Sequence, residues 1–123
     1  RSGKGIYQGK NNAGTTYRYE GDFLDNVFAG RGIMTWSNGE RYEGSYANDM
    51  RNGKGIYTWP SGSRYEGDFV DGKRTGKGVY TWASGARYEG EFLNEARTGY
   101  GVYRFPDGRE LRGRFENGEY VGP

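Results

Sequence analysis

The sequence contains no cysteine and no histidine among its 123 residues. Thiol nucleophiles, histidine general bases, structural zinc sites and iron–sulfur clusters each need one of these side chains, so all four are excluded. Disulfides are excluded as well, which leaves the redox compartment undetermined. Carboxylates are plentiful, but none stands in a recognisable acid–base motif. We therefore expect no catalysis, no cofactor and no metal in this chain.

Aliphatic side chains are scarce. Leu, Ile, Val and Phe together provide only 17 of the 123 residues, and no apolar run approaches the roughly 20 residues that span a bilayer. The net charge of +2 is too small for a typical disordered or nucleic-acid-binding chain. The chain begins at Arg1 without a signal peptide, so we expect part of a longer protein with a cytoplasmic or membrane-peripheral location. The apolar content consists mainly of rings, with 12 Tyr, 6 Phe and 3 Trp beside 24 Gly.

The glycines and rings recur with a period of 23 residues. Four full units cover residues 19–41, 42–64, 65–87 and 88–110, with partial units at 1–18 and 111–123. Counted from the first Tyr of each unit, glycine stands at positions 3, 12, 14 and 21, and rings stand at positions 1, 5 and 18. Such a period indicates a repeat architecture in which each unit buries its apolar face against its neighbours. We expect residues 1–123 to form a single array.

Each unit is predicted to be a β-hairpin. Residues 41–46 and 54–59 are short, ring-rich segments bounded by turn-forming residues. The second segment ends in a ring that is followed three residues later by Gly, which favours a tight loop. The other connection, 47–52, is polar and longer. A helix is disfavoured, because the frequent glycines would cost about 1 kcal/mol each.

Alternation along the strands places rings and glycines on one face of the predicted sheet. Tyr42, Gly44 and Tyr46 point the same way, and the ring-plus-glycine pattern places Tyr57 and Trp59 on that face as well. Rings of one strand can cover the bare backbone of glycines in the next strand. Charged and aliphatic side chains are left for the opposite face.

The phrase Tyr-Glu-Gly-Asp-Phe, followed by Gly-Lys-Gly-Val-Tyr-Thr-Trp and a further Gly, resembles the MORN (membrane occupation and recognition nexus) repeat. The resemblance covers residues 19–110 fully and both flanks partly. It implies an all-β fold, an elongated single-layer twisted antiparallel sheet of stacked 23-residue β-hairpin repeats with about ten strands. It also implies a non-catalytic module for partner binding, self-association or lipid binding. The chain departs from the family pattern in two ways. MORN repeats often place His before the paired glycines, where this chain has other residues, and Leu111 with Arg112 replaces the opening Tyr-Glu of the last unit. These changes suggest that the last unit caps the array.

The stripe of rings is open to two interpretations. The rings are the core, or they line a groove that accepts an extended or helical segment of a partner, and a single-layer sheet can use one ring set for both. The candidate groove residues are Tyr42, Tyr46, Tyr57, Trp59, Tyr65, Phe69, Tyr80, Trp82, Tyr88 and Phe92. Carbohydrate or choline capture is less favoured, because adjacent Trp-Tyr-Tyr clusters are absent.

Basic residues gather where the second strand of each unit begins. If stacking aligned them along one edge, they would attract anionic lipid headgroups by about 1 kcal/mol per residue. The candidate lipid edge comprises Arg51, Lys54, Lys73, Arg74, Lys77 and Arg97. Acidic residues in the same connections would cancel part of this field, so solvated loop charge is the competing interpretation. The Arg-Tyr-Glu triplets, such as Arg41 to Glu43, predict a solvated charge ladder on the face opposite the rings.

The sequence therefore predicts a non-enzymatic interaction or scaffold module that presents a ring-lined groove to a protein partner or to a second copy. Attachment to an anionic membrane, and a regulatory role beside an enzyme domain outside this chain, stay open as alternatives. We expect no nucleic acid and no small-molecule substrate. Self-association would use the ring face or the end strands. Of these, 109–116 is guarded by charges that include Arg109, Glu110, Arg112 and Arg114, and 3–7 is less guarded.

Overall fold

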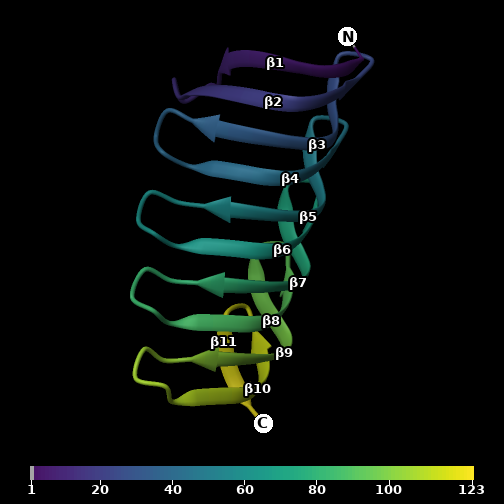
Figure 1. Ribbon diagram of the computed structural model, residues 1–123. Helices are drawn as coiled ribbons and strands as arrows, with labels where there is room; N and C mark the ends of the chain where they lie inside the picture. The colour runs from purple at the N-terminus through teal and green to yellow at the C-terminus, as the bar shows by residue number, and fades with distance from the viewer. Residues whose placement is uncertain (1) are drawn as a thin grey trace.

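The computed structural model describes residues 2–123, and these residues form one open antiparallel sheet whose strand order follows the chain (Figure 1). The strands are β1 (Gly3–Lys10), β2 (Thr16–Leu24), β3 (Val27–Trp36), β4 (Arg41–Ala47), β5 (Met50–Thr58), β6 (Arg64–Val70), β7 (Lys73–Thr81), β8 (Arg87–Leu93), β9 (Ala96–Arg104), β10 (Glu110–Glu116) and β11 (Glu119–Gly122). The predicted all-β, single-layer fold is confirmed, with eleven described strands rather than about ten. Within 2–123 there is no helix that could span a bilayer.

The connection 47–52, predicted to be long, is a two-residue turn. Asn48 and Asp49 have φ values of 50° and 67°, as a type I′ hairpin turn requires at both central positions. Strand β5 therefore starts already at Met50, not at residue 54. Asn, Asp and Gly tolerate this left-handed conformation better than other residues. Equivalent turns lie at Asp25–Asn26, Asp71–Gly72, Asn94–Glu95 and Asn117–Gly118.

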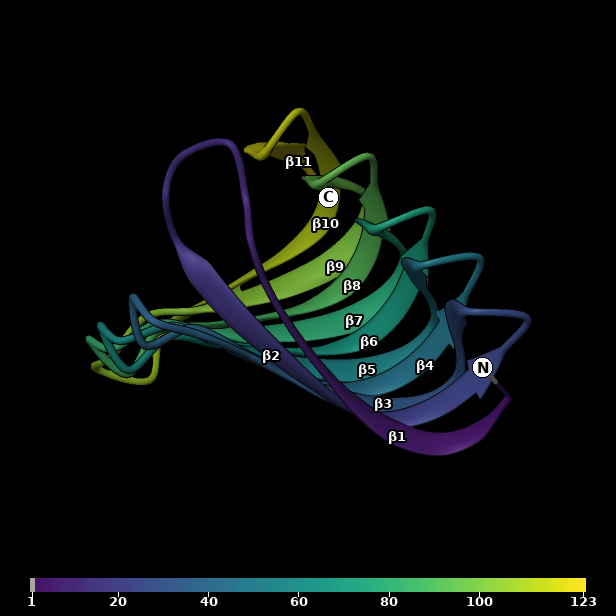
Figure 2. The ribbon, with the colours of Figure 1, turned by 90° about the horizontal axis from the view of Figure 1, so that it is seen from above.

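A bulge next to each of these turns bends the hairpin. Gly44 pairs with Gly55, but Tyr46 pairs with Arg51, so β5 carries extra residues in this interval. One of them is Gly53, whose φ of 90° suits a residue without a Cβ. Bulges bend the strand that contains them. The turn ends of the hairpins accordingly curl to one side, and the sheet forms a trough when it is viewed along the array (Figure 2).

One tyrosine in each full unit is completely buried, with an exposed fraction of 0% for Tyr19, Tyr42, Tyr65 and Tyr88. The ring of Tyr65 covers Gly78 so closely that a Cβ on this glycine would overlap it. Its hydroxyl donates a 2.8 Å hydrogen bond to the carbonyl oxygen of Asp68. Gly67 is the direct partner of Gly78, which lets the two backbones and the ring come together. The prediction that rings cover bare backbone is confirmed.

A second ring from each unit joins these tyrosines into a continuous column. Phe69 meets Tyr42 edge-on at a centroid distance of 5.1 Å and Tyr65 at 5.2 Å. Similar edge-to-face contacts extend from Phe23 to Phe115. This geometry is worth about 0.5–1.5 kcal/mol per pair beyond the burial itself. Each unit therefore completes the core of its neighbour, as expected for a repeat array.

Both ends of the array differ from the prediction. Half of the stretch 8–17, predicted to be irregular, is strand, because β1 continues to Lys10 and β2 begins at Thr16. The charged segment 109–116 is not the terminal strand, because β11 pairs with residues 114–116 of β10. The end strands of the described sheet are therefore β1 and β11.

The contact between ring and glycine predicts that Gly78→Ala destabilises the fold by about 3 kcal/mol, because the new methyl group overpacks the Tyr65 ring. Gly85→Ala is the control, because an added Cβ at Gly85 meets nothing within 4 Å. Unlike Gly78, Gly85 has a positive φ, of 97°. We expect this control to lose only about 1 kcal/mol from backbone strain. Urea unfolding measures both values, and equal losses would contradict this account of the core.

Stability is also expected to fall at alkaline pH. Burial raises the pKa of Tyr19 and Tyr42 to about 12, whereas an unfolded tyrosine has a pKa of about 10. A pKa that is higher in the folded state contributes stability below pH 10, and this contribution is lost as the pH rises from about 10 to 12. Urea unfolding at several pH values tests this. Tyr42→Phe should make the free energy of unfolding fall less steeply with pH, whereas Tyr100→Phe at the exposed surface should leave the slope unchanged. A wild-type free energy of unfolding that does not depend on pH in this range would refute the prediction.

Candidate interaction surface

Most of the predicted groove is core. Seven of its ten rings have exposed fractions of at most 7%, and these are Tyr42, Tyr46, Tyr57, Tyr65, Phe69, Tyr88 and Phe92. Trp59, Tyr80 and Trp82 lie at the edge of this core and keep partly exposed surfaces. A partner on the ring face would therefore meet these three residues and their equivalents in other units.

The accessible rings form a continuous row that we call the outer aromatic ladder. Its members are Trp36, Tyr57, Trp59, Tyr80, Trp82, Tyr103 and Phe105, and all except Tyr57 are partly exposed. Successive centroids lie 5.4, 4.6, 5.4, 4.6, 5.4 and 5.0 Å apart. The row lies beside the tight loops, where for example the amide of Gly62 donates to the carbonyl of Trp59 at 3.0 Å. These loops hold the ends of the ladder strands in place.

Arg51, Arg74 and Arg97 lie on the ring face, between the buried column and the outer aromatic ladder. The guanidinium carbon of Arg74 is 5.4 Å from the centroid of Tyr80 and 5.8 Å from that of Trp59. Arg97 lies likewise, 5.4 Å from Trp82. Cations at this range are attracted to the ring faces. The three arginines therefore form a guanidinium column parallel to the ladder.

The outer units place an aromatic ring where the inner units place a guanidinium. Phe28, which is 23 residues before Arg51, stacks on Tyr19 with a centroid distance of 4.0 Å and an interplanar angle of 15°. Tyr120, which is 23 residues after Arg97, meets Phe115 at 5.4 Å. A flat group thus covers the same part of the core in every unit.

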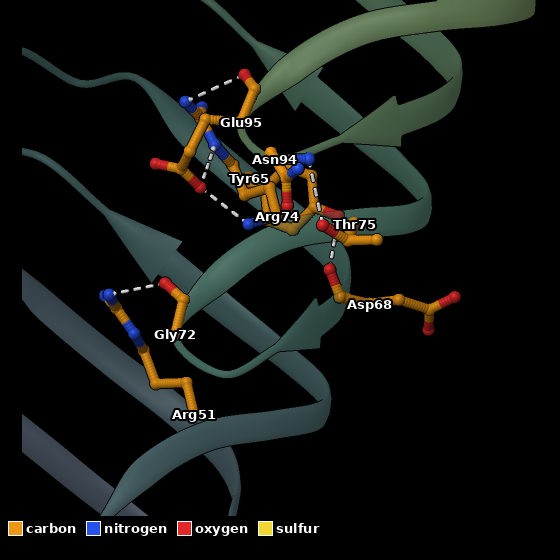
Figure 3. Close-up of polar contacts among 8 residues, drawn as sticks. All are labelled: Arg51, Tyr65, Asp68, Gly72, Arg74, Thr75, Asn94 and Glu95. Carbon is orange, nitrogen blue, oxygen red and sulfur yellow. Dashed lines mark hydrogen bonds and ion pairs between the residues drawn. The ribbon is translucent and has the colours of Figure 1, made fainter.

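The arginines also join neighbouring hairpins (Figure 3). Arg51 donates a 2.7 Å hydrogen bond to the carbonyl oxygen of Gly72 in the next turn. Arg74 forms a 3.2 Å ion pair with Glu95 and also donates to its carbonyl oxygen. Within residues 2–123, Arg51 and Arg97 have no carboxylate partner within 4 Å. Their positive charges are therefore not neutralised by an ion pair in the described array.

The six basic residues predicted to line one edge do not share one surface. Lys54 and Lys77 lie on the face opposite the rings, away from the three arginines, because strand side chains alternate. Lys54 forms a 2.5 Å ion pair with Asp68. Burial acts to raise the pKa of Asp68, but hydrogen bonds from Lys54 and the Lys77 amide lower it below its usual value. Lys73 is exposed at the start of β7 beside the turn.

The face opposite the rings carries a broad hollow of about 920 Å³. Ile56 and Val79 lie in its floor, flanked by glutamates of neighbouring strands. These glutamates pair with the arginine two residues earlier, for example Glu43 with Arg41 at 3.1 Å. The predicted charge ladder is thus present, and exposed pairs of this kind contribute little to stability. In the described part of the chain, no three acidic side chains gather as a metal site would require.

Comparison with known families agrees with this geometry. The family model of the MORN repeat matches residues 19–41, 42–64, 65–87 and 88–108. The matched segments coincide with the four full units, apart from the last two residues of the fourth. A search of curated proteins found no match to the chain.

The alternation of arginine and aromatic residues predicts how Arg51 can be replaced. Arg51→Phe should keep the free energy of unfolding within about 0.5 kcal/mol of the wild-type value, because the ring of Phe28 covers the core at the equivalent position of the first unit. Arg51→Ala should lose about 1 kcal/mol with the stacking and packing. Lys73→Ala is the control and should be nearly neutral. Chemical denaturation compares the three variants, and a Phe variant as unstable as the Ala variant would contradict this role.

Proposed function

Because the chain belongs to the MORN repeat family, whose repeats act as protein and membrane interaction modules, we propose that this array binds a protein partner on its ring face. The outer aromatic ladder is the contact surface. The observation that carries the proposal is a continuous row of partly exposed Tyr and Trp rings beside a column of three arginines. Two of these arginines, Arg51 and Arg97, have no ion-pair partner within residues 2–123. The array is non-catalytic and acts by binding alone.

The chemistry of the ladder favours a protein partner. Trp and Tyr combine a large apolar surface with a polar group, and they are enriched where protein interfaces gain most of their binding energy. In the described part of the chain, Trp59, Tyr80 and Trp82 form no side-chain hydrogen bond, so their N–H and O–H groups are free to meet a partner. The rings rest on a sheet that holds them in one row, which reduces the entropy lost on binding.

Membrane attachment has weaker support. Lys54 is neutralised by Asp68, and Arg74 by Glu95. The remaining arginines lie against rings on the other face from the lysines. Within residues 2–123, the six basic residues of the candidate lipid edge therefore do not lie together on one surface, as an anionic bilayer would require.

The test compares two double variants. The first combines Trp59→Ala and Trp82→Ala on the ring face, and the control combines Ile56→Ala and Val79→Ala on the opposite face. Partners trapped by photo-crosslinking at the ladder are identified and purified, and their affinity is then measured by titration calorimetry. We expect the ring-face pair to weaken binding by at least about tenfold and the control pair to change it by less than about twofold.

The same variants distinguish the membrane alternative. Vesicles rich in anionic lipid are floated with the wild type and with the double tryptophan variant at low and at physiological salt. If both proteins float equally well at low salt, and both lose flotation at physiological salt, membrane binding would replace the present proposal.

A further inference from the structure

We propose that the segment recognised by the outer aromatic ladder is proline-rich, acidic and in the polyproline II conformation. This inference rests on the proposed function and specifies its ligand. The carrying observation is that a tyrosine and a guanidinium recur along the ring face in the second, third and fourth full units. The second and third of these units add a partly exposed tryptophan, and the fourth has Phe105 in its place.

The repeat length of the array matches one turn of polyproline II. Each unit advances the sheet by two strands, which corresponds to about 9.4–9.8 Å. The ladder is consistent with this spacing, because Trp59 and Trp82 are linked through Tyr80 by steps of 5.4 and 4.6 Å. Polyproline II has three residues per turn and rises about 9.3 Å in that turn. Every third ligand residue would therefore meet an equivalent position in the next repeat.

Other conformations do not keep this register. In an extended strand, side chains on one face recur about every 6.6 Å, so they drift away from the ladder within one repeat. In an α-helix, one repeat corresponds to about 6.4 residues, which is not a whole number. Of these three conformations, polyproline II is the one that repeats its contacts from unit to unit without adjustment.

The exposed groups of the ladder suit the backbone and side chains of such a segment. Polyproline II has no internal hydrogen bonds, so its carbonyl groups accept bonds from outside. Trp59 and Trp82 offer indole N–H donors that have no partner in the described array. Flat proline rings pack against aromatic side chains, which is how proline-rich segments bind in aromatic grooves of other proteins.

The guanidinium column specifies an acidic ligand. A recess of about 150 Å³ opens between Arg51 and Arg74, and its walls include Tyr57, Trp59 and Glu95. Glu95 already pairs with Arg74, whereas Arg51 and Arg97 have no carboxylate partner among residues 2–123. Arg51 and Arg97 are two repeats apart, which corresponds to about six residues of polyproline II. Two carboxylates with this separation would meet both arginines.

The experiment uses labelled peptides of about 12 residues, long enough for roughly four repeats. Repeats of Pro-Pro-Glu are compared with Pro-Pro-Lys, which reverses the charge, and with Gly-Ser-Glu, which keeps the charge but has no preformed conformation. Affinity for the intact chain is measured by fluorescence anisotropy. We expect Pro-Pro-Glu to bind at least about tenfold more tightly than either control peptide.

Protein variants locate the bound peptide. The double substitution Trp59→Ala with Trp82→Ala should weaken Pro-Pro-Glu binding by about tenfold. Arg97→Gln should weaken Pro-Pro-Glu binding severalfold, but it should not change the binding of Pro-Pro-Gln, an uncharged peptide that has no carboxylate for Arg97 to meet. The pair Ile56→Ala with Val79→Ala on the opposite face should change nothing. Circular dichroism establishes that each variant is folded.

Equal affinity for Gly-Ser-Glu, no binding of Pro-Pro-Glu, or binding that ignores the tryptophans would each overturn this inference. A partner that occupies the ladder as a strand or a helix would also overturn it but would leave the proposed function standing. A partner that binds elsewhere on the array would refute both.

Discussion

The contact of a tyrosine ring with a pair of glycines is the constraint on which the rest of the array depends. A single-layer sheet has no second layer to cover its apolar face, so it must bury rings against its own backbone. The fully buried Tyr42 lies on Gly55, and its hydroxyl donates to the carbonyl oxygen of Ser45. The missing side chains of the glycines create the space that the ring fills. One repeat supplies the ring and the glycines, and its neighbours supply the edge-on rings that enclose them.

The bulge beside each turn influences which side chains of the ring face are buried and which stay accessible. It curls the hairpin end over the buried tyrosines, and it brings Arg51, Arg74 and Arg97 over the rim of that core. The arginines therefore have two roles. Their flat faces cover rings, as Phe28 does in the first unit, and their charges stay beside the outer aromatic ladder. A binding surface with a regular spacing of rings and charges follows from the same contacts that stabilise the array.

The period of 23 residues and the alternation within each strand predicted much of this structure. They placed the hairpins, the ring face, the glycines beneath the rings and the charge ladder opposite. They also contained a signal that was missed, because Arg51 has the same strand parity as Tyr57 and Trp59 and so belongs on their face. The two-residue turn at Asn48 and Asp49 was not predicted, because the bulge residues that follow it resemble a loop in composition.

By itself, the sequence determined that the chain is a repeat array of β-hairpins, since residue spacing alone sets which side chains share a strand face. The tertiary structure decided which of those side chains stay accessible. Tyr65 and Trp59 are both rings on one face, but only the curled hairpin end buries the first and leaves the second at the edge. Likewise, Arg51 and Lys54 are close neighbours in the chain, yet alternation and the bend direct them to opposite surfaces. Burial depends on neighbouring repeats, and no single repeat encodes it.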